Sequence, residues 1–367
     1  MSGKKKILFS AYSMEVGGIE TALVNLLNYL ADTDKYKITL VLEKRKGILL
    51  NKLNSDIRII EYNPSYNKIL GKAINCIKRL KFIAVHKNKY DASFAYATYC
   101  NMAIVTAQIA SRNSNLWVHG SYLDIFNNNK DKYVKFFKDM NVDSFKNILF
   151  VSNRSKNEFE TIVGKKNTIL CNNIIDYNKI QDLSKETIDE KSADLCTFLY
   201  VGRMTEVSKK FSRLLEISKI LRDKNLEFRV LAIGNGVDYE KYVKYVNDNN
   251  LQNYVYFLGE KNNPYPYFKI SDALVLVSEN EGYPVVYNEA RVLKLPIITT
   301  DVSDSLQDID GKYGIVCGQD INSVVKVMEN LIINGSNKVF KSMEVFDSQK
   351  YNEDIKNKID NIINERN

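Results

Sequence analysis

The chain has 367 residues, with a hydrophobic fraction of 45% and a charged fraction of 26%, which indicates a soluble globular protein long enough for two domains. Three lysines at positions 4–6 lead into an apolar run too short for a secretory signal, and polar side chains interrupt the longest charge-free stretch, residues 92–111. These features argue against a signal peptide and a membrane span, and we expect a cytoplasmic protein.

The cysteines and the net charge reduce the number of function classes to consider. No Cys-x-x-Cys pair occurs, and an odd, dispersed set of thiols favours core packing over a catalytic thiol or disulfides. The net charge is +8, but no zinc, helix-turn-helix or RNA-binding signature accompanies it, so nucleic acid is not an expected partner. The five cysteines are Cys76, Cys100, Cys171, Cys196 and Cys317.

The first half of the chain alternates short apolar runs with helical patterns, as a parallel sheet with crossover helices does. A Gly17-Gly18 turn after the first strand opens a helix at 19–30, and a buried helix follows the strand that starts at Ala92. We expect strands at 6–11, 36–42, 92–96, 115–118, 147–151 and 168–170.

The segment 62–90 carries almost the whole charge excess, because it has seven basic residues and no acidic one. Its apolar residues recur at helical spacing, so we expect an amphipathic helix with a basic face. Such a helix is a candidate for contact with anionic lipid at the inner face of the plasma membrane, through residues 68–89, and the alternative is a solvated surface helix. His86 is expected on the surface. The apolar residues are Ile69, Leu70, Ala73, Ile74, Ile77, Leu80 and Ile83.

The pattern restarts after a polar stretch, which predicts two domains and a linker. We expect a first domain at 1–178, a linker at 179–194, a second domain at 195–350, and a terminal helix at 351–367 that returns to the first domain. The fold class is therefore α/β, with two doubly wound parallel sheets and a ligand in the cleft between them, at the carboxyl ends of the strands. The strands of the second domain are expected at 197–201, 228–233, 254–258, 273–277 and 297–299, with a helix at 212–223.

The segment Glu281-Gly-Tyr-Pro-Val-Val-Tyr-Asn-Glu289 follows a buried strand and opens a helix. Pro284 suits the first turn, where its missing N–H costs nothing, and the next residues carry unpaired N–H groups that attract a phosphate. Carboxylates on both sides suit a ligand with hydroxyls at both ends and a charged middle, such as a nucleotide sugar. The alternative is an ordinary strand–loop–helix with solvated carboxylates.

This segment resembles the Glu-x7-Glu motif of retaining GT-B glycosyltransferases, in particular family 4, also called glycosyl transferases group 1. A second stretch, residues 201–215, is similar to the segment where that family places an Arg and a Lys on the donor diphosphate. The resemblance implies Arg203 and Lys209 for these roles. The sequence departs from the family at Lys210, where glycine is usual, which leaves open whether Lys209 or Lys210 contacts the diphosphate.

The resemblance also implies roles for residues in both halves. His119 would help to stabilise positive charge at the anomeric carbon, and its alternative is a hydrogen-bonded structural histidine. Glu281 would engage sugar hydroxyls, and Glu289 would accept hydrogen bonds from the ribose. The catalytic set is therefore His119, Arg203, Lys209 and Glu281. The donor-binding set is Gly17, Gly18, Gly234, Asn235, Gly259, Glu260, Tyr283, Pro284, Val285, Val286 and Glu289.

The implied function is a metal-independent, retaining GT-B glycosyltransferase without a cofactor. Its donor is a nucleotide sugar, a UDP-hexose or UDP-N-acetylhexosamine, and its acceptor is a glycan or lipid-linked oligosaccharide in bacterial surface polysaccharide synthesis of the capsule or O-antigen type. Two alternatives stay open, a nucleotide-sugar 2-epimerase on the same fold and a degenerate partner subunit. No metal-ligand cluster is apparent, and the Asp-x-Asp pairs at 32–34 and 308–310 are interpreted as surface turns.

Overall fold

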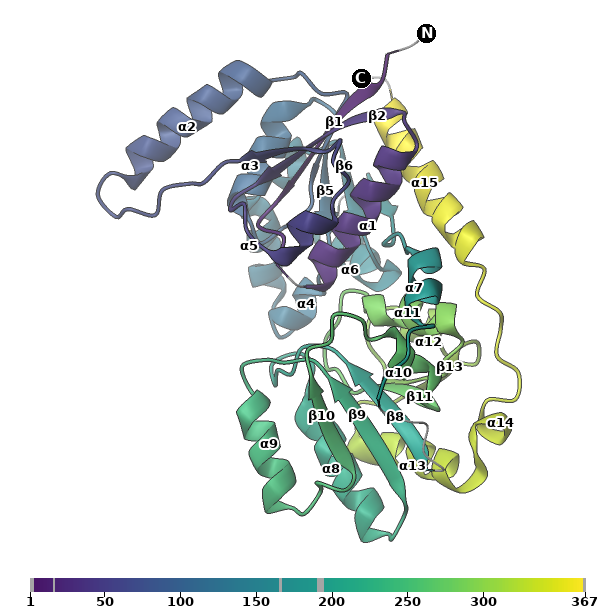
Figure 1. Cartoon of the computed structure of the whole chain (residues 1–367). Helices are drawn as coiled ribbons and strands as arrows, with labels where there is room; N and C mark the ends of the chain where they lie inside the picture. The colour runs from purple at the N-terminus through teal and green to yellow at the C-terminus, as the bar shows by residue number, and fades with distance from the viewer. Residues whose placement is uncertain (1–2, 16, 165–166, 190–194, 366–367) are drawn as a thin grey trace. The chain divides into compact units, whose positions relative to one another are not determined.

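The computed structural model describes residues 3–15, 17–164, 167–189 and 195–365. The chain forms two compact units: unit 1 is Met1–Ile175 with Gln349–Asn367, and unit 2 is Asp176–Ser348. Each unit contains one parallel sheet with helices packed against it (Figure 1). The prediction of an α/β fold with two Rossmann-like parallel sheets is therefore confirmed.

Unit 1 has a seven-stranded sheet in the order β3-β2-β1-β4-β5-β6-β7. The central strand β1 is buried from Ile7 to Ala11, as expected of a parallel strand covered on both faces. Its strands are β1 (Lys5–Ala11), β2 (Tyr36–Leu42), β3 (Arg58–Glu61), β4 (Ala92–Ala95), β5 (Ser114–Val118), β6 (Asn147–Phe150) and β7 (Thr168–Leu170). Its helices are α1 (Gly18–Asp32), α2 (Gly71–His86), α3 (Asn101–Ala110), α4 (Tyr122–Ile125), α5 (Lys130–Asp139), α6 (Asn153–Val163) and α15 (Ser348–Asn364), with short 3-10 turns at Ile48–Lys52 and Val142–Ser144.

Unit 2 has a six-stranded sheet in the order β10-β9-β8-β11-β12-β13. Strand β8 pairs with β9 on one side and with β11 on the other. The order in which strands are added to the sheet therefore reverses between β8 and β11, which makes this the topological switch point. The strands are β8 (Cys196–Val201), β9 (Phe228–Ile233), β10 (Val255–Gly259), β11 (Ala273–Leu276), β12 (Ile297–Thr300) and β13 (Gly314–Cys317). The helices are α7 (Tyr177–Leu183), α8 (Phe211–Asp223), α9 (Tyr239–Asp248), α10 (Tyr265–Lys269), α11 (Val285–Leu293), α12 (Ser305–Asp308), α13 (Ile321–Asn334) and α14 (Ser336–Val339).

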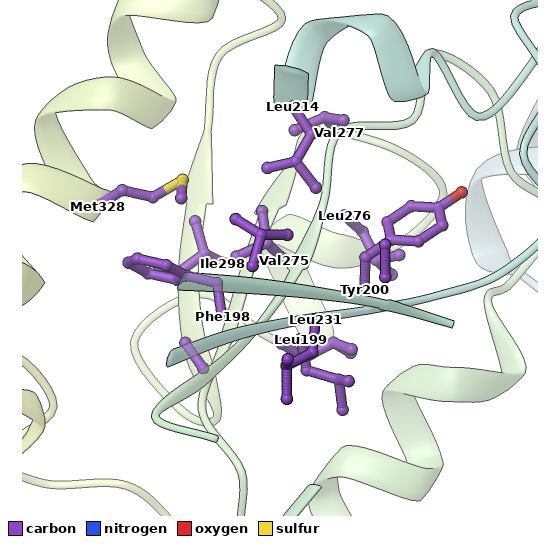
Figure 2. Close-up of a cluster of buried hydrophobic side chains, with 14 of the residues drawn as sticks. Phe198, Leu199, Tyr200, Leu214, Leu231, Val275, Leu276, Val277, Ile298 and Met328 are labelled. Carbon is purple, nitrogen blue, oxygen red and sulfur yellow. The ribbon is translucent and has the colours of Figure 1, made fainter. Parts of the chain in front are cut away.

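The core of unit 2 surrounds the pairing of β8 with β11. Figure 2 shows Phe198 of β8 close to Val275 of β11, and Leu199 of β8 close to Leu231 of β9, and none of these side chains is more than 2% exposed. This apolar contact on both faces of the sheet holds the two strand ends next to each other.

The start of the expected linker differs from the structure. Residues 177–183 form α7, which is capped by the Asp176 side chain accepting from the Lys179 N–H at 3.2 Å and which packs against α10 and α11. The apolar contacts of α7 explain why this segment folds with unit 2 despite its polar composition. Residues 190–194 of the expected linker lie outside the described residues.

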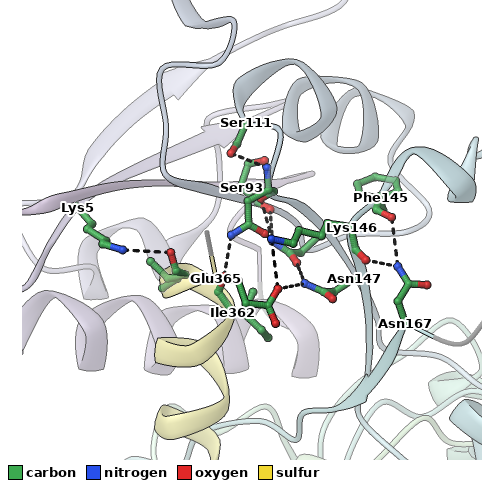
Figure 3. A network of polar contacts seen from close by, with 12 residues as sticks. Lys5, Ser93, Ser111, Phe145, Lys146, Asn147, Asn167, Ile362 and Glu365 are labelled. Carbon is green, nitrogen blue, oxygen red and sulfur yellow. Dashed lines mark hydrogen bonds and ion pairs between the residues drawn. The ribbon is translucent and has the colours of Figure 1, made fainter. Parts of the chain in front are cut away.

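The last helix, α15, packs on unit 1. Its inward face carries four buried isoleucines, and the Lys5 ammonium donates to the Ile363 carbonyl while Lys146 pairs with Glu365 at 3.4 Å (Figure 3). The Asn352 side chain accepts from the Ile175 N–H at 3.0 Å and donates to the Ile175 carbonyl at 2.7 Å. The buried isoleucines are Ile355, Ile359, Ile362 and Ile363.

The surface position expected for His86 is wrong. The side chain is buried at the end of α2, where Nδ1 lies 3.0 Å from the Tyr90 hydroxyl and the ring lies 4.5 Å from that of Phe82. Packing of an aromatic ring against two others outweighs the exposure that the surrounding lysines suggested.

We expect Asn352→Ala to lower the free energy of unfolding of unit 1 by about 2 kcal/mol, because both buried backbone groups of Ile175 lose their partner. Trp117 is the single tryptophan and is buried in β5, so urea unfolding followed by its fluorescence reports on unit 1. Asn357→Ala, an exposed position on the same helix, is the matched control. Equal midpoints for the two variants would contradict the expectation.

Candidate functional site

Two turns at the carboxyl end of the unit 2 sheet meet through an ion pair. Lys209 lies in the turn from β8 to α8, Glu281 lies in the turn from β11 to α11, and the Lys209 ammonium contacts Glu281 Oε1. Both side chains are mostly covered, with 15% and 13% of their surface exposed, and the Ser278 hydroxyl donates to the same carboxylate oxygen at 2.8 Å. The structure therefore brings together two of the predicted catalytic residues that lie 72 positions apart in the sequence.

Arg203 lies in the same β8–α8 turn, with its side chain exposed. The turn is held by the buried Tyr200 hydroxyl, which donates to the Arg203 carbonyl at 2.9 Å, and by the Met204 N–H, which donates to the Asn235 carbonyl at 2.9 Å. Within the ranges that the structure describes, Arg203 takes part in no ion pair. Its backbone is fixed while its guanidinium remains available to an anionic ligand.

Lys210 occupies a left-handed backbone position, with φ 47° and ψ 43°, at the start of α8. Glycine is favoured there because a Cβ atom is crowded in this conformation. The Lys210 ammonium pairs with Glu279 at 3.3 Å, whereas that of Lys209 pairs with Glu281. The departure from the family pattern therefore has a local cost, and the two lysines face different carboxylates.

The glycines after β9 allow two loops to approach each other. A Cβ at Gly234, which has φ 137°, would lie 2.0 Å from the Gly202 carbonyl oxygen, and one at Gly236 would lie 2.1 Å from that of Met204. The Gly234 N–H donates to the Gly259 carbonyl at 2.9 Å, so three strand ends are linked by backbone contacts. Asn235 and Glu260 project from these loops and are exposed.

Helix α11 begins beside the ion pair, and its first turn is firmly packed. Pro284 is the N-cap, and Val285 and Val286 follow it with the N–H groups that no residue of the helix can accept. Arg291 donates to the buried Tyr283 hydroxyl at 3.2 Å, and its guanidinium lies over the rings of Tyr313 and Phe346 at 4.4 Å and 3.8 Å. This end of α11 can accept a phosphate through backbone N–H groups and the helix dipole.

Glu289 lies in the second turn of α11 and is partly buried. The Tyr265 hydroxyl donates to Glu289 Oε1 at 3.2 Å. Burial raises the pKa of the Glu289 carboxyl to about 7, and the hydrogen bond from Tyr265 opposes that shift. The carboxyl is therefore poised between its two protonation states near neutral pH.

Sequence reasoning missed the residues that hold this site. The Thr300 hydroxyl donates to the Ser278 carbonyl at 2.6 Å, the Ser303 hydroxyl donates to the Gly282 carbonyl, and Arg291 fixes Tyr283. Thr300 and Ser303 lie 22 and 21 positions from their partners, so no local motif signals those contacts. Arg291 lies only 8 positions from Tyr283, but no motif marks that pair either. The sequence shows only that Thr300 ends an apolar strand and that Ser303 follows it in a polar run.

In unit 1, Gly17 caps α1 and Gly18 is its first residue. A Cβ at Gly17 would lie 2.2 Å from Glu20 Oε2, so the Glu20 carboxylate folds back over the start of the helix. The Tyr99 hydroxyl donates to Glu20 Oε1 at 2.9 Å. The helix start is thus covered by the chain's own anion, as in a capping box.

His119 follows β5 in unit 1, and its ring is buried against Tyr96 and Trp117, at centroid distances of 4.3 Å and 5.8 Å. Among the described residues, neither ring nitrogen has a hydrogen-bond partner. Burial lowers the pKa of His119 to about 3, so the imidazole is neutral at physiological pH.

The predicted residues of unit 2 thus gather at one edge of one sheet, and Gly17, Gly18 and His119 belong to unit 1. Among the described residues, no group of three or more His, Cys, Asp or Glu side chains is placed to hold a metal ion.

Comparison with known proteins places this arrangement in a fold class. The chain matches the crystal structure of HepE from Anabaena in complex with UDP and glucose, with a TM-score of 0.74, 18% identity, and coverage of 97% of this chain and 99% of HepE. At that identity the likeness defines the fold, and the fold is GT-B.

A known family matches part of the second unit. Residues 196–334 match the family described as "Glycosyl transferases group 1". The capsular polysaccharide biosynthesis glycosyltransferase CapM of Staphylococcus aureus is 26% identical over 52% of this chain and 50% of CapM. A 4-alpha-N-acetylgalactosaminyltransferase of Campylobacter jejuni, named for an acceptor on diphospho-undecaprenol, is 24% identical over 85% of this chain and 86% of that protein.

The chain has the GT-B fold, residues 196–334 of its second unit match glycosyl transferases group 1, and the resemblance to GT-B glycosyltransferases is confirmed. The chain spans about half the length of CapM and of the matching glycosyltransferase of Methanocaldococcus jannaschii. Membership of family 4 and retention of configuration stay predictions.

We expect Glu289→Gln to stabilise the protein at pH 8 by about 2 to 3 kcal/mol. The carboxyl has a higher pKa in the folded chain, about 7, than in the unfolded chain, about 4.5. The wild type therefore loses stability as pH rises from 4.5 to 7, at roughly 1.4 kcal/mol per unit of pKa difference. Thermal unfolding of both proteins between pH 4 and pH 8 tests this, and parallel curves would contradict it.

We expect Lys210→Gly to raise the free energy of unfolding of unit 2 by about 0.5 to 1 kcal/mol, because relief of the left-handed strain exceeds the loss of a half-exposed ion pair. Lys210→Ala is the control, since it removes the same ammonium and keeps the Cβ. Thermal unfolding by circular dichroism measures both, and a glycine variant no more stable than the alanine variant would disprove the strain.

Proposed function

We propose that this protein is a retaining, metal-independent glycosyltransferase that moves a hexose or N-acetylhexosamine from a UDP-linked donor to a lipid-linked oligosaccharide or other glycan. The pathway would be bacterial surface polysaccharide synthesis, of the capsule or O-antigen type. The observation that carries the proposal is the Lys209–Glu281 pair, which joins the β8–α8 turn that contains Arg203 to the turn that leads into α11.

The pair and its surroundings suit a departing nucleoside diphosphate. When the bond between the anomeric carbon and the diphosphate oxygen breaks, the leaving group gains negative charge that must be offset. Arg203 is exposed and fixed at its backbone, Lys209 lies close by, and the first N–H groups of α11 add a positive dipole end. Glu281 holds the Lys209 ammonium in place until the diphosphate arrives and then is free to accept from sugar hydroxyls.

Glu289 is suited to accept hydrogen bonds from the ribose hydroxyls, because it is partly buried and is held by the Tyr265 hydroxyl. Ionisation near pH 7 makes it an acceptor for two hydroxyls, and contact with them would favour the charged form. The exposed Asn235 and Glu260 lie in the loops that would line the nucleoside.

Retention of configuration would follow from attack on the same face that the diphosphate leaves. The acceptor oxygen bonds to the anomeric carbon, the bond to the diphosphate breaks, and the acceptor proton passes to a diphosphate oxygen. A neutral His119, with both ring nitrogens unpaired among the described residues, could offer a lone pair toward a positive sugar without competing for charge.

The setting is supported by the relatives. CapM is named for capsular polysaccharide biosynthesis, and the Campylobacter protein is named for transfer of N-acetylgalactosamine to a sugar on diphospho-undecaprenol. An acceptor of that kind lies in a membrane. No helix of the described residues has the length and apolar character of a membrane span, and we propose peripheral contact through residues 68–89.

The test is slow hydrolysis of a panel of UDP- and GDP-sugars by the purified chain, without acceptor and in the presence of EDTA. We expect release of UDP from one donor, and a loss of 100-fold or more in Arg203→Ala and Lys209→Ala, the size typical of removing one stabiliser of a developing anion. Lys210→Ala is the matched control and should retain the rate within a few-fold.

Other results would point elsewhere. A free sugar epimer as product would favour the 2-epimerase. If the chain neither hydrolyses nor binds any of the donors, the degenerate partner subunit would be favoured. If EDTA abolishes the activity and a divalent ion restores it, the enzyme depends on a metal. Metal independence would then be wrong, and the proposed glycosyl transfer would still stand.

A further inference from the structure

The outward face of α2 is apolar. Ala73, Ile77, Leu80 and Ala84 recur at intervals of four, three and four residues, which places them on one side of the helix, and all four are exposed. Ile77 and Leu80 are 54% and 59% exposed. Just before the helix, Ile69 and Leu70 are 89% and 60% exposed, which extends the apolar surface. We call these six residues the α2 stripe.

The stripe is exposed although α2 is anchored to unit 1. Phe82 and His86 point the other way and are buried, and the Phe82 ring lies 5.9 Å from that of Tyr62. The helix therefore keeps its outward orientation. An apolar face of this length is costly in water, so it marks a contact surface.

Basic residues border the stripe. Lys72 and Arg79 lie along one side and Lys81 along the other, and no acidic residue occurs between positions 62 and 90. An apolar face flanked by lysine and arginine is the pattern of a helix that lies in the interface of a membrane with anionic lipids. A protein partner would be expected to meet charges of both signs, and a nucleic acid would gain nothing from exposed isoleucine and leucine.

A hollow adjoins the next row of the helix. Its volume is 370 Å³, and Arg79, Ile83 and Lys87 of that row line it together with Arg112. The other lining residues carry amides and hydroxyls, apart from the apolar Val105 and Ile109, and no carboxylate lines the hollow. Three positive groups with uncharged hydrogen-bond donors form a surface suited to a phosphate ester.

The hollow lies away from the edge of the sheet that carries His119. It includes residues that precede β4, β5 and β6, such as Asn88, Ser111 and Ser144, so it lies at the amino ends of the strands, whereas His119 follows the carboxyl end of β5. A ligand in the hollow therefore lies apart from a sugar beside His119.

We propose that α2 docks on an anionic membrane, with the α2 stripe in the interface and the phosphate of an anionic phospholipid in the hollow between Arg79, Lys87 and Arg112. The surface would hold unit 1 where a lipid-linked acceptor is found, and in that respect the inference rests on the proposed function. The stripe supplies apolar burial, and the hollow makes the contact selective for lipids with a charged phosphate.

The experiment is flotation of the full chain with vesicles of phosphatidylcholine alone or mixed with phosphatidylglycerol. We expect binding to the mixed vesicles only. The stripe variant Ile77→Glu/Leu80→Glu should bind at least tenfold more weakly, and the hollow variant Arg79→Gln/Lys87→Gln/Arg112→Gln roughly a hundredfold more weakly, from about 1 kcal/mol for each basic residue near an anionic surface.

Matched controls carry the same charge changes on unit 2. Ile333→Glu/Val345→Glu adds two acids at positions 63% and 78% exposed, and Lys241→Gln/Lys326→Gln/Lys341→Gln removes three exposed bases. Both should bind like the wild type. Losses in the controls as large as those in the α2 variants would overturn the docking surface, since net charge alone would then explain binding.

Two further measurements separate the possible failures. One outcome is that the wild type binds inorganic phosphate and no vesicles, with phosphate binding lost in Arg79→Gln/Lys87→Gln/Arg112→Gln. That result would identify the ligand of the hollow as free phosphate and overturn the proposal. UDP binding by the same variants should stay unchanged. Vesicle binding without turnover of any nucleotide sugar would leave the membrane surface standing and remove the proposed function.

Discussion

The pairing of β8 with β11 at the centre of the unit 2 sheet is the constraint on which the candidate site depends. These strands are separated by more than seventy residues, yet their carboxyl ends lie side by side, so the turns that follow them share one small volume. The ammonium of Lys209 and the carboxylate of Glu281 meet there because the apolar contacts of Phe198, Leu199 and Leu276 fix the strands beneath them. Without that pairing, the motif residues would be isolated charges on two loops.

The same edge shows how the fold positions chemistry without using the catalytic side chains as structural supports. Tyr200, Thr300 and Ser303 hold backbone carbonyls of the turns, and Arg291 packs on aromatic rings and donates to the Tyr283 hydroxyl and the Asn288 amide oxygen. Arg203, by contrast, contributes only its carbonyl to the framework. A cation that is not used in a structural contact can interact with the negative charge that develops on a ligand.

The sequence was sufficient for most of the fold and for the two motifs whose residues, Lys209 and Glu281, meet in the structure. Strands β2 and β9 are mostly apolar, with Lys37, Thr39 and Arg229 as the exceptions, so both were predictable from the sequence. Strand β3 was not predicted because its four residues begin with Arg58 and end with Glu61, and β13 was not predicted because it begins with Gly314, a residue type that strands disfavour. The paired segments around Lys209 and Glu281 are local motifs, whereas Ser303 on Gly282 is a tertiary contact with no local signal. Periodicity also marked the apolar face of α2 but could not say which side would meet the sheet, a choice decided by the bulk of Phe82 and His86.

The C-terminal helix has a consequence for the order in which the protein folds. Unit 1 needs α15, whose residues follow the whole of unit 2 in the chain, so every residue of unit 2 is synthesised before α15 is complete. Unit 1 therefore begins before unit 2 and is completed after it, and its hydrophobic face for Ile355, Ile359 and Ile362 is uncovered while unit 2 is already able to fold. Protection of that face during synthesis, by slow elongation or by a chaperone, is a requirement of this topology.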